Sequence, residues 1–315
     1  MAVNPNTTSS DIPKRRYHPN PFLTSSPSSP VPNAPQPLKR ALLPSYLLAS
    51  LTHILTNCPP TLPWLSPFRA GIPSQTYKGL FSGPTSIAYL FYSLSLSTTP
   101  TTRTLQIHNK TLLQWSKAYL SLGQDTVPRM LSQNCGISNE YLAFHTLSAC
   151  IYRDETHAMK VLNALGNLNK DKETTPATYC ELLKGRAGGL YILRLLKRGM
   201  PHLTEEIDIL SEKLTDEILG QYPWTWDGRR YLGAVHGEIG ILTQIVLSSP
   251  SRSRARAQSE SHPFLEKILL EILDLQGEDG NWPVVPGKDL GLVQFCHGAA
   301  GVVISLLAMK RSFFF

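Results

Sequence analysis

Four side chains suited to metal binding or proton transfer lie beside glycine-containing turns. Cys296 and His297 come shortly before the apolar segment 299–309, while His236 and Glu181 lie beside earlier turns of the same kind. A cysteine at a helix start feels the positive helix N-terminus, which lowers the pKa of the thiol and suits the thiolate to metal binding. A histidine titrates near neutral pH and can accept or donate a proton. If the turns converge, these residues predict a metal-binding and proton-transfer site.

Each of these residues also has a purely structural interpretation. Cys296 could be a small buried residue beside a helix start. His236 could cap or fill its turn, and Glu181 could be an exposed partner for Lys184 three residues later. The comparable positions of the side chains in successive repeats favour the chemical interpretation.

The elements that must position these residues are helices. Beyond residue 38, apolar residues recur at intervals of three and four, the spacing of the buried stripe of a helix. The segments with this spacing are 42–54, 105–122, 141–152, 190–196, 207–218 and 264–275. No alternating run rich in Val, Ile and Thr competes with this pattern. The sequence therefore predicts an all-α protein.

Glycine-containing turns open apolar helices at intervals of roughly 50 residues, a spacing typical of a repeat of two helices. The first glycines of these turns are Gly83, Gly136, Gly185, Gly237 and Gly298. The last interval is the longest because it contains the polar insertion 249–261. A residue without a Cβ lets the chain turn sharply and lets the next helix begin against its neighbour. Helix pairs at this period either stack as an open solenoid or close into a ring with the turns along one rim.

Blocks around these turns resemble the LanC family, especially its eukaryotic LanC-like branch. In chain order the blocks are 81–89, 181–188, 231–237, 280–283 and 295–301. The resemblance implies an (α/α) toroid of seven helix pairs, in which outer helices enclose an inner barrel with zinc at one end. It also implies addition of a thiol to dehydroalanine or dehydrobutyrine, which forms a thioether such as a lanthionine ring. The implied partners are glutathione, or a peptide or protein that contains cysteine or dehydroamino acids.

The same resemblance implies a role for each of the four side chains. Cys296 matches the first zinc ligand, and His236 matches the histidine proposed as the acid–base group. His297 falls where the family has a tyrosine or histidine beside the zinc, and Glu181 falls where bacterial members carry a catalytic aspartate. The chemistry agrees with these roles, because zinc stabilises a thiolate at neutral pH. Addition to the alkene then leaves an enolate that a histidine can protonate.

The resemblance stops short of the family's second Cys-His-Gly motif, which supplies two further zinc ligands. At a period of about 50 residues this motif is expected roughly at position 345, whereas the sequence given ends at Phe315. We therefore expect a toroid domain over residues 39–315 that is C-terminally truncated, with about five of the seven helix pairs. Its last pair would leave apolar faces uncovered, and the chain would be marginally stable or dependent on a partner.

Three functions stay open at this point. The first is zinc-dependent thiol addition, and the second is a non-catalytic protein that binds glutathione or another protein; the missing motif favours the second. The third is a toroid that acts on carbohydrate, which needs two acidic residues at the rim. Glu181, Glu238 and Asp279 are the candidates, but the Cys-His-Gly block would then have no purpose.

Composition limits the remaining classes. The chain has 315 residues, of which 42% are hydrophobic, and a formal net charge of +7. Basic residues at 14–16 and 252–256 predict solvated loops, and we expect no nucleic-acid partner because no reading motif accompanies them. Residues 1–38 are rich in Ser, Pro, Asn and Thr, which predicts a disordered tail.

Features at the N-terminus and the cysteine content predict the compartment. The chain does not start with a charged segment followed by an apolar run, and no apolar stretch reaches the roughly 18 residues of a membrane span. Five cysteines make an odd number in a chain without an export signal. We therefore expect reduced thiols and a cytoplasmic protein without a transmembrane segment.

Overall fold

The computed structural model describes residues 43–61, 79–123, 134–168, 179–249, 262–288 and 291–313. Within these ranges the chain consists of helices and one short hairpin. The predicted all-α class and the helix-pair arrangement are confirmed. The predicted tail over residues 1–38 and most of the predicted insertion 249–261 lie outside the described residues.

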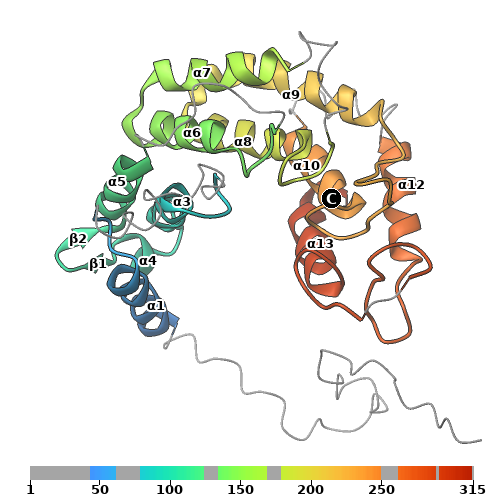
Figure 1. Cartoon of the computed structure of the whole chain (residues 1–315), viewed down its shortest axis with the longest axis horizontal. Helices are drawn as coiled ribbons and strands as arrows, with labels where there is room; N and C mark the ends of the chain where they lie inside the picture. Colours follow the sequence, from blue (N-terminus) through green and yellow to red (C-terminus); the bar gives the residue numbers. More distant parts are fainter. Residues whose placement is uncertain are drawn as a thin grey trace, which may run out of the picture.

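The inner side of the molecule is formed by a row of helices that follows an arc (Figure 1). These inner helices are α3 (Pro84–Ser95), α6 (Glu140–Tyr152), α8 (Arg186–Gly199), α10 (Glu238–Ser248) and α13 (Ala299–Phe313). The predicted turn glycines Gly83, Gly185 and Gly237 are the N-cap residues of α3, α8 and α10. The glycine turns therefore begin the inner helices, as the repeat pattern predicts.

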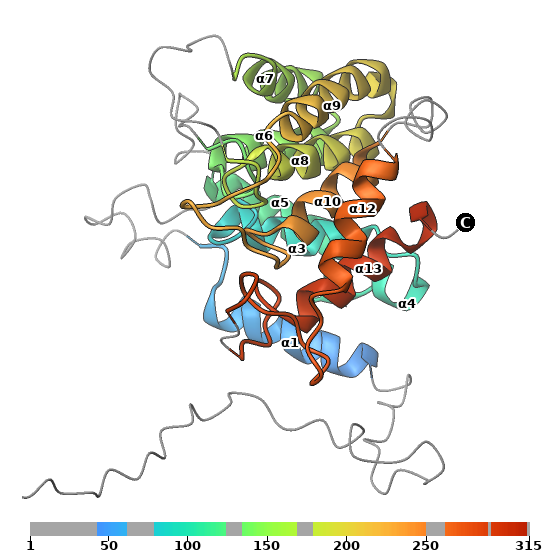
Figure 2. The same cartoon turned by 90° about the vertical axis from the view of Figure 1, so that its right-hand side faces the viewer.

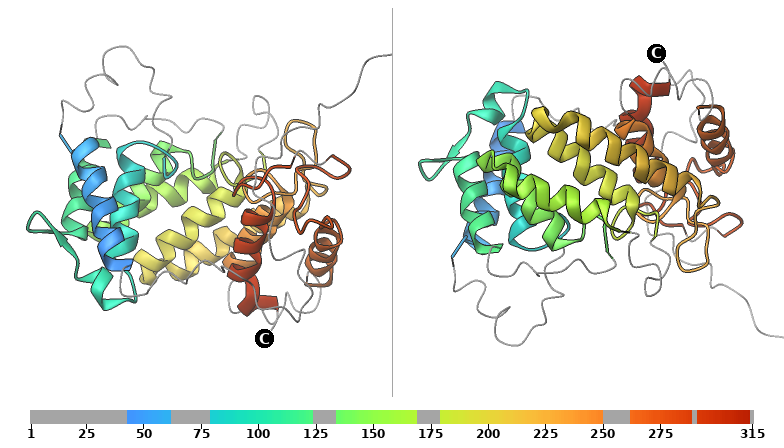
Figure 3. Two further views of the ribbon diagram at one scale, coloured as in Figure 1. Left: turned by 90° about the horizontal axis from the view of Figure 1, so that it is seen from below. Right: turned by 90° about the horizontal axis from the view of Figure 1, so that it is seen from above.

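A second layer of helices packs behind the inner row (Figures 1 and 2). These outer helices are α5 (Leu112–Gly123), α7 (Glu155–Gly166), α9 (Thr204–Leu219) and α12 (His262–Leu273). They pack behind α3, α6, α8 and α10 respectively. The right view of Figure 3 shows α7 (green) and α9 (yellow) side by side along the arc. Each repeat therefore buries the apolar stripe of one outer and one inner helix.

The two ends of the arc are α1 (Leu43–Asn57) and α13. Two short helical segments, α4 (Pro100–Arg103) and the 3₁₀ helix Pro201–Leu203, lie in connections between longer helices. Among the described residues α13 has no outer helix behind it, and Val303, Ile304 and Leu307 on α13 are 45%, 53% and 67% exposed. In the described part of the chain, these three apolar side chains of α13 are therefore exposed to solvent.

One predicted helix is partly wrong. The segment 105–122 was expected to be helical throughout, but its first part is a hairpin of β1 (Gln106–Ile107) and β2 (Lys110–Thr111). His108 and Asn109 at the tip have positive φ angles of 50° and 58°, the conformation of a tight hairpin turn. The Trp115 indole donates a hydrogen bond to the Ile107 carbonyl at 3.0 Å, which holds the hairpin against the start of α5.

Backbone hydrogen bonds join the turns of successive repeats along one rim. The Leu80 N–H donates to the Ile137 carbonyl at 2.9 Å, and the Ile137 N–H donates to the Leu182 carbonyl at 3.1 Å. The Leu182 N–H in turn donates to the Val235 carbonyl at 3.0 Å. The turns approach so closely that a Cβ on Gly136 would lie 2.3 Å from the Leu183 carbonyl oxygen. This row of bonds sets the turn before α8 directly against the turn before α10.

No helix in the described ranges is long and apolar enough to cross a membrane. All five cysteines are unpaired, as expected for reduced thiols.

Candidate functional site

A buried carboxylate and a histidine meet where the turn before α8 touches the turn before α10. The His236 Nδ1 lies 3.0 Å from a carboxylate oxygen of Glu181, and the two side chains are 20% and 2% exposed. The bond between Leu182 and Val235 lies one residue away from each partner and fixes their separation. Two residues 55 positions apart in the sequence are thus held together by the rim.

The Glu181 carboxylate is held by its own turn. The backbone N–H of Leu183 donates to it at 2.8 Å, and the N–H of Lys184 donates to its other oxygen. The interpretation of Glu181 as an exposed partner of the Lys184 side chain is therefore wrong. Because an ionised carboxylate can only accept hydrogen bonds, His236 donates from Nδ1, and Nε2 carries the lone pair in the neutral ring. Nε2 is therefore the acceptor atom of the neutral ring.

An indole ring covers one face of the His236 imidazole. The ring centroids of Trp226 and His236 lie 4.3 Å apart with planes 21° from parallel. Trp226 begins a tight hairpin that closes by backbone bonds with Arg229, and Asp227 and Gly228 at its tip have φ angles of 52° and 70°. Trp226 was not among the residues predicted from the sequence. The Asp-Gly pair is the one local signal that could have indicated the hairpin.

His297 lies beside this pair on the turn before α13. Its ring centroid is 6.4 Å from that of His236. The Tyr231 ring contacts both histidines, with its centroid 5.7 Å from that of His297 and 6.4 Å from that of His236. The His297 Nδ1 atom is buried and has no hydrogen-bond partner. Burial, and to a smaller degree the proximity of His236, lowers the pKa of His297. A neutral imidazole at this position can accept a hydrogen bond from a bound group.

Cys296 lies on the same turn and is partly exposed. Its thiol is 3.2 Å from the amide oxygen of Gln294 and donates a hydrogen bond to it. The Cys296 backbone packs so closely against Gly233 that a Cβ added to Gly233 would lie 1.9 Å from the Cys296 carbonyl oxygen. The Cys-His-Gly turn is thereby attached to the turn that carries His236.

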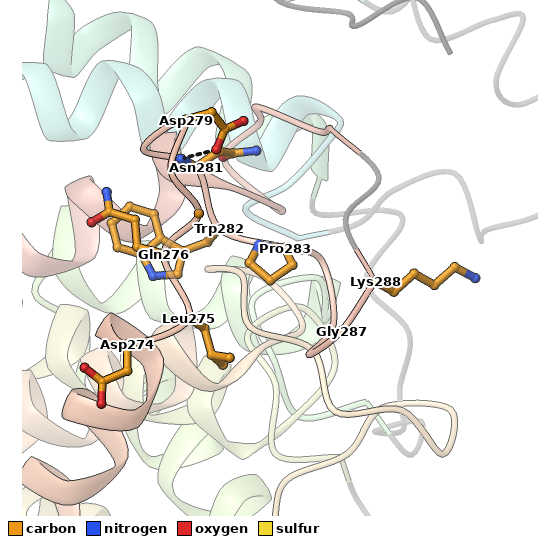
Figure 4. Close-up of a pocket in the computed structure, with 10 residues that line it drawn as sticks. Asp274, Leu275, Gln276, Asp279, Asn281, Trp282, Pro283, Gly287 and Lys288 are labelled. Atoms are coloured by element: carbon orange, nitrogen blue, oxygen red, sulfur yellow. Dashed lines mark hydrogen bonds between the residues drawn. The ribbon is translucent and has the colours of Figure 1, made fainter. Parts of the chain in front are cut away.

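The Asn281 side chain fixes the other side of the Cys-His-Gly turn. Its amide oxygen accepts from the Ala299 N–H at 2.7 Å, and its amide nitrogen donates to the Leu292 carbonyl at 3.1 Å. Gly298 between them has a φ angle of 98°, which side chains rarely adopt. The loop of Asn281 also lines a pocket of about 390 Å³, shown in Figure 4, from which the Lys288 side chain points away. The Gly-Asn-Trp-Pro block therefore supports the cysteine turn structurally.

The described residues do not by themselves fit a catalytic zinc site. Such a site takes three protein ligands and an open position. No three His, Cys, Asp or Glu side chains in the described ranges lie close enough together to hold a metal ion. Cys296 remains a predicted first ligand.

The acidic residues considered for a carbohydrate site have other partners. Glu238 is fully buried and accepts two hydrogen bonds from the Arg230 guanidinium at 2.7 and 2.9 Å. The Asp279 carboxylate accepts from the Asn281 N–H at 3.1 Å within its own turn. Glu181 is bound to His236. The geometry favours the carboxylate–histidine pair over a pair of acids as the reactive group.

The fold and the rim together define an (α/α) helix-pair protein with its polar residues at the turns. The family model described as lanthionine synthetase C-like protein matches residues 74–314. The chain therefore belongs to the lanthionine synthetase C-like family, and the resemblance of its sequence blocks to LanC-like proteins is confirmed.

Proposed function

We propose that this chain carries the acid–base part of a thiol-addition site. The site would join the thiol of glutathione, or of a cysteine in a peptide, to the double bond of a dehydroamino acid. The observation that supports this proposal is the Glu181–His236 pair, in which the His236 Nδ1 lies 3.0 Å from the buried Glu181 carboxylate. The chain that carries this pair belongs to the lanthionine synthetase C-like family. A site for simple peptide or thiol binding would not need this fixed, oriented imidazole.

The proposed step moves one proton through His236 and forms one carbon–sulfur bond. The Nε2 atom of neutral His236 takes the proton from the thiol, and the sulfur forms a bond to the β-carbon of the dehydroamino acid. The π electrons move toward the neighbouring carbonyl and leave an enolate. The imidazolium then returns the proton to the α-carbon, and the thioether results with no net change in protons. Glu181 stabilises the imidazolium during the step and keeps Nδ1 protonated.

The neighbouring aromatic residues would shape the site around this proton transfer. Trp226 covers one face of the His236 imidazole, so a substrate would approach the ring from the other face. His297 would accept a hydrogen bond from the bound amide or thiol, because its Nδ1 has no partner in the protein. The family is generally zinc-binding, and Cys296 would be the ligand that this chain offers.

A second candidate function is binding of glutathione or of a protein without turnover. It is supported by the absence of a three-ligand metal group from the described residues. The two candidates make different predictions for one experiment, since the first requires product and the second requires only a complex.

The test uses the full chain, reduced glutathione and a short peptide that contains dehydroalanine, near neutral pH, with and without added zinc. Thioether product is followed by mass spectrometry above the uncatalysed rate. We expect His236→Gln to lower the rate of product formation roughly 10²–10⁴-fold, the usual contribution of a general acid–base group.

The matched control is His202→Gln. His202 has a 56% exposed side chain in the 3₁₀ helix Pro201–Leu203, just before α9, where it pairs with Glu155 at 3.7 Å. This variant should keep the rate of the unchanged protein. Equal rates for His236→Gln and the unchanged protein would overturn the proposal. Binding of glutathione without product, in either zinc condition, would establish the second candidate function instead.

A further inference from the structure

Arg194, on the inner helix α8, is a half-buried cation whose contacts are all neutral. Its two terminal nitrogens donate to the Ser248 hydroxyl at 2.9 Å and to the Gln244 amide oxygen at 2.7 Å. Its guanidinium carbon lies 5.2 Å from the centre of the Tyr191 ring. No carboxylate of the described residues contacts it. Burial lowers the pKa of Arg194, so the charge is held where solvation is poor.

Two other arginines near the same helices differ from Arg194 in this respect. Arg186, the first residue of α8, pairs with Glu217 at 2.7 Å. Arg230 pairs with Glu238 at 2.7 Å. A buried charge is normally compensated by an opposite charge, because neutral hydrogen bonds replace only part of its hydration. Among the described residues, Arg194 therefore has no counter-charge of the kind that the other two arginines have.

The guanidinium is on the inner side of the arc. The hydroxyls of Tyr89 on α3 and Tyr191 on α8 are hydrogen-bonded to each other, although α6 lies between these two helices. Because α7 covers the outer side of α6, this bond passes over the inner side. The stacking of Arg194 on Tyr191 places the charge beside the same surface.

A carboxylate is the anion that best matches this position. One carboxylate neutralises one guanidinium, whereas a doubly charged phosphate would leave excess negative charge in a half-buried place. The planar guanidinium can also bind both oxygens of a carboxylate with its remaining N–H groups. The distance between Arg194 and the rim indicates how long the ligand must be. Arg194 lies eight residues beyond Arg186 on α8, about 12 Å along the helix, which an extended peptide covers in roughly four residues.

We propose that Arg194 binds a carboxylate of a peptide ligand that lies along the inner side of the arc, about four residues from the group held at the Glu181–His236 rim. The placement of the peptide relative to the rim rests on the proposed function. The carboxylate site itself rests on the contacts of Arg194 alone.

The test compares two synthetic peptides that contain a cysteine and, four positions away, either glutamate or glutamine. Their affinities for the full chain are measured by isothermal titration calorimetry in reducing buffer. We expect the glutamate peptide to bind about tenfold more tightly. Arg194→Gln should abolish this preference and Arg194→Lys should retain part of it. The control Arg198→Gln, at an exposed position one turn further on the same helix, should keep the whole preference.

A second measurement keeps the test independent of the folding of the variants. In the unchanged protein, the NMR signal of the Arg194 Nε–H group should shift when the glutamate peptide is added and stay in place with the glutamine peptide. Equal affinities of the two peptides, or a preference that survives in Arg194→Gln, would overturn the proposal. Displacement of the glutamate peptide by inorganic phosphate but not by acetate would overturn the choice of a carboxylate. No thiol addition is needed for either measurement, so failure of the proposed chemistry would leave the result interpretable.

Discussion

Two buried glutamates lie on the same rim of the arc and have different kinds of partner. Glu140, the first residue of α6, accepts hydrogen bonds from the Gly79 N–H at 2.9 Å and from the Thr85 hydroxyl. Glu181, before α8, accepts from two N–H groups of its own turn and from His236. Both carboxylates therefore connect their turn to the neighbouring repeat.

The difference lies in whether the partner can exchange a proton. The partners of Glu140 are a backbone N–H and a threonine hydroxyl, which do not accept a proton near neutral pH, so a proton on the Glu140 carboxyl has no partner to move to. Burial raises the pKa of Glu140 to about 7, although its hydrogen bonds with Thr85 and Gly79 act in the opposite direction. The partner of Glu181 is an imidazole, whose second ring nitrogen can accept a proton in the proposed chemistry. Under the proposed function, the Glu181 junction therefore holds its turns together and also takes part in proton transfer.

The largest expected effect separates these two roles by activity. Glu181→Gln removes the charge that stabilises the His236 imidazolium, so we expect the rate of thioether formation to fall roughly 10²–10³-fold. Glu140→Gln should change this rate by less than about threefold, because no step of the proposed chemistry uses that carboxyl group. Both rates are measured with glutathione and the dehydroalanine peptide. Similar losses in the two variants would remove the distinction between the junctions.

The sequence predicts the frame of this site better than its details. Apolar periodicity and glycine spacing indicate the helix pairs, because both reflect local geometry that every repeat must satisfy. The turn positions of Glu181 and His236 also indicate that they converge, since equivalent turns of neighbouring repeats lie side by side. Segment 105–111 was wrongly predicted to be helical, because a tight turn at His108 and Asn109 folds it into a hairpin before α5 begins.

Other features of the site depend on contacts between distant segments. Trp226 stacks on His236 from a connecting loop, and no spacing along the chain indicates that contact. Asn281 belongs to a recognised block, but its role comes from bonds to Leu292 and Ala299 that only the folded turn brings near. Glu140 escapes sequence analysis because its partners are a backbone N–H and a threonine hydroxyl, which carry no distinctive signal in the sequence.

A smaller effect concerns stability and pH at the Glu140 junction. The pKa of Glu140 is raised from 4.5 to about 7 in the folded chain. The contribution of this group to the free energy of unfolding is therefore fully present below pH 4.5. As pH rises from 4.5 through 7, the unfolded carboxyl group ionises first, and the free energy of unfolding falls by about 3 kcal/mol. Glu140→Gln should remove this loss. Urea unfolding of both proteins across this pH range measures the difference.

The comparison of the unchanged protein with Glu140→Gln separates the effect of Glu140 from that of other titrating groups. Burial lowers the pKa of His145 to about 4, and this histidine acts in the opposite direction, because its stabilising effect is lost as pH falls below 6.5. It is present in both proteins and cancels. Parallel stability curves for the two proteins would mean that Glu140 is not held in the neutral form and would contradict the structural role assigned to its junction.

The smallest effect comes from removing one hydrogen bond at the same junction. Thr85→Val keeps the shape of the side chain but removes the hydroxyl that donates to Glu140, so the free energy of unfolding should fall by about 1–2 kcal/mol. The pKa of Glu140 should rise further above 7, because the bond with Thr85 favours the ionised form. Carbon-13 NMR titration of the Glu140 carboxyl group follows this shift.

The control for this change is Thr243→Val. Thr243 is also buried, but its hydroxyl donates to the Ile239 carbonyl within its own helix and touches no carboxylate. This variant should leave the pKa of Glu140 unchanged. If Thr85→Val left it unchanged as well, burial alone would set the protonation of Glu140, and the bond between the two turns would be a consequence of their packing. A rise confined to Thr85→Val would show that the hydroxyl tunes a carboxyl group that has no proton-accepting partner, in contrast to Glu181, whose partner is His236.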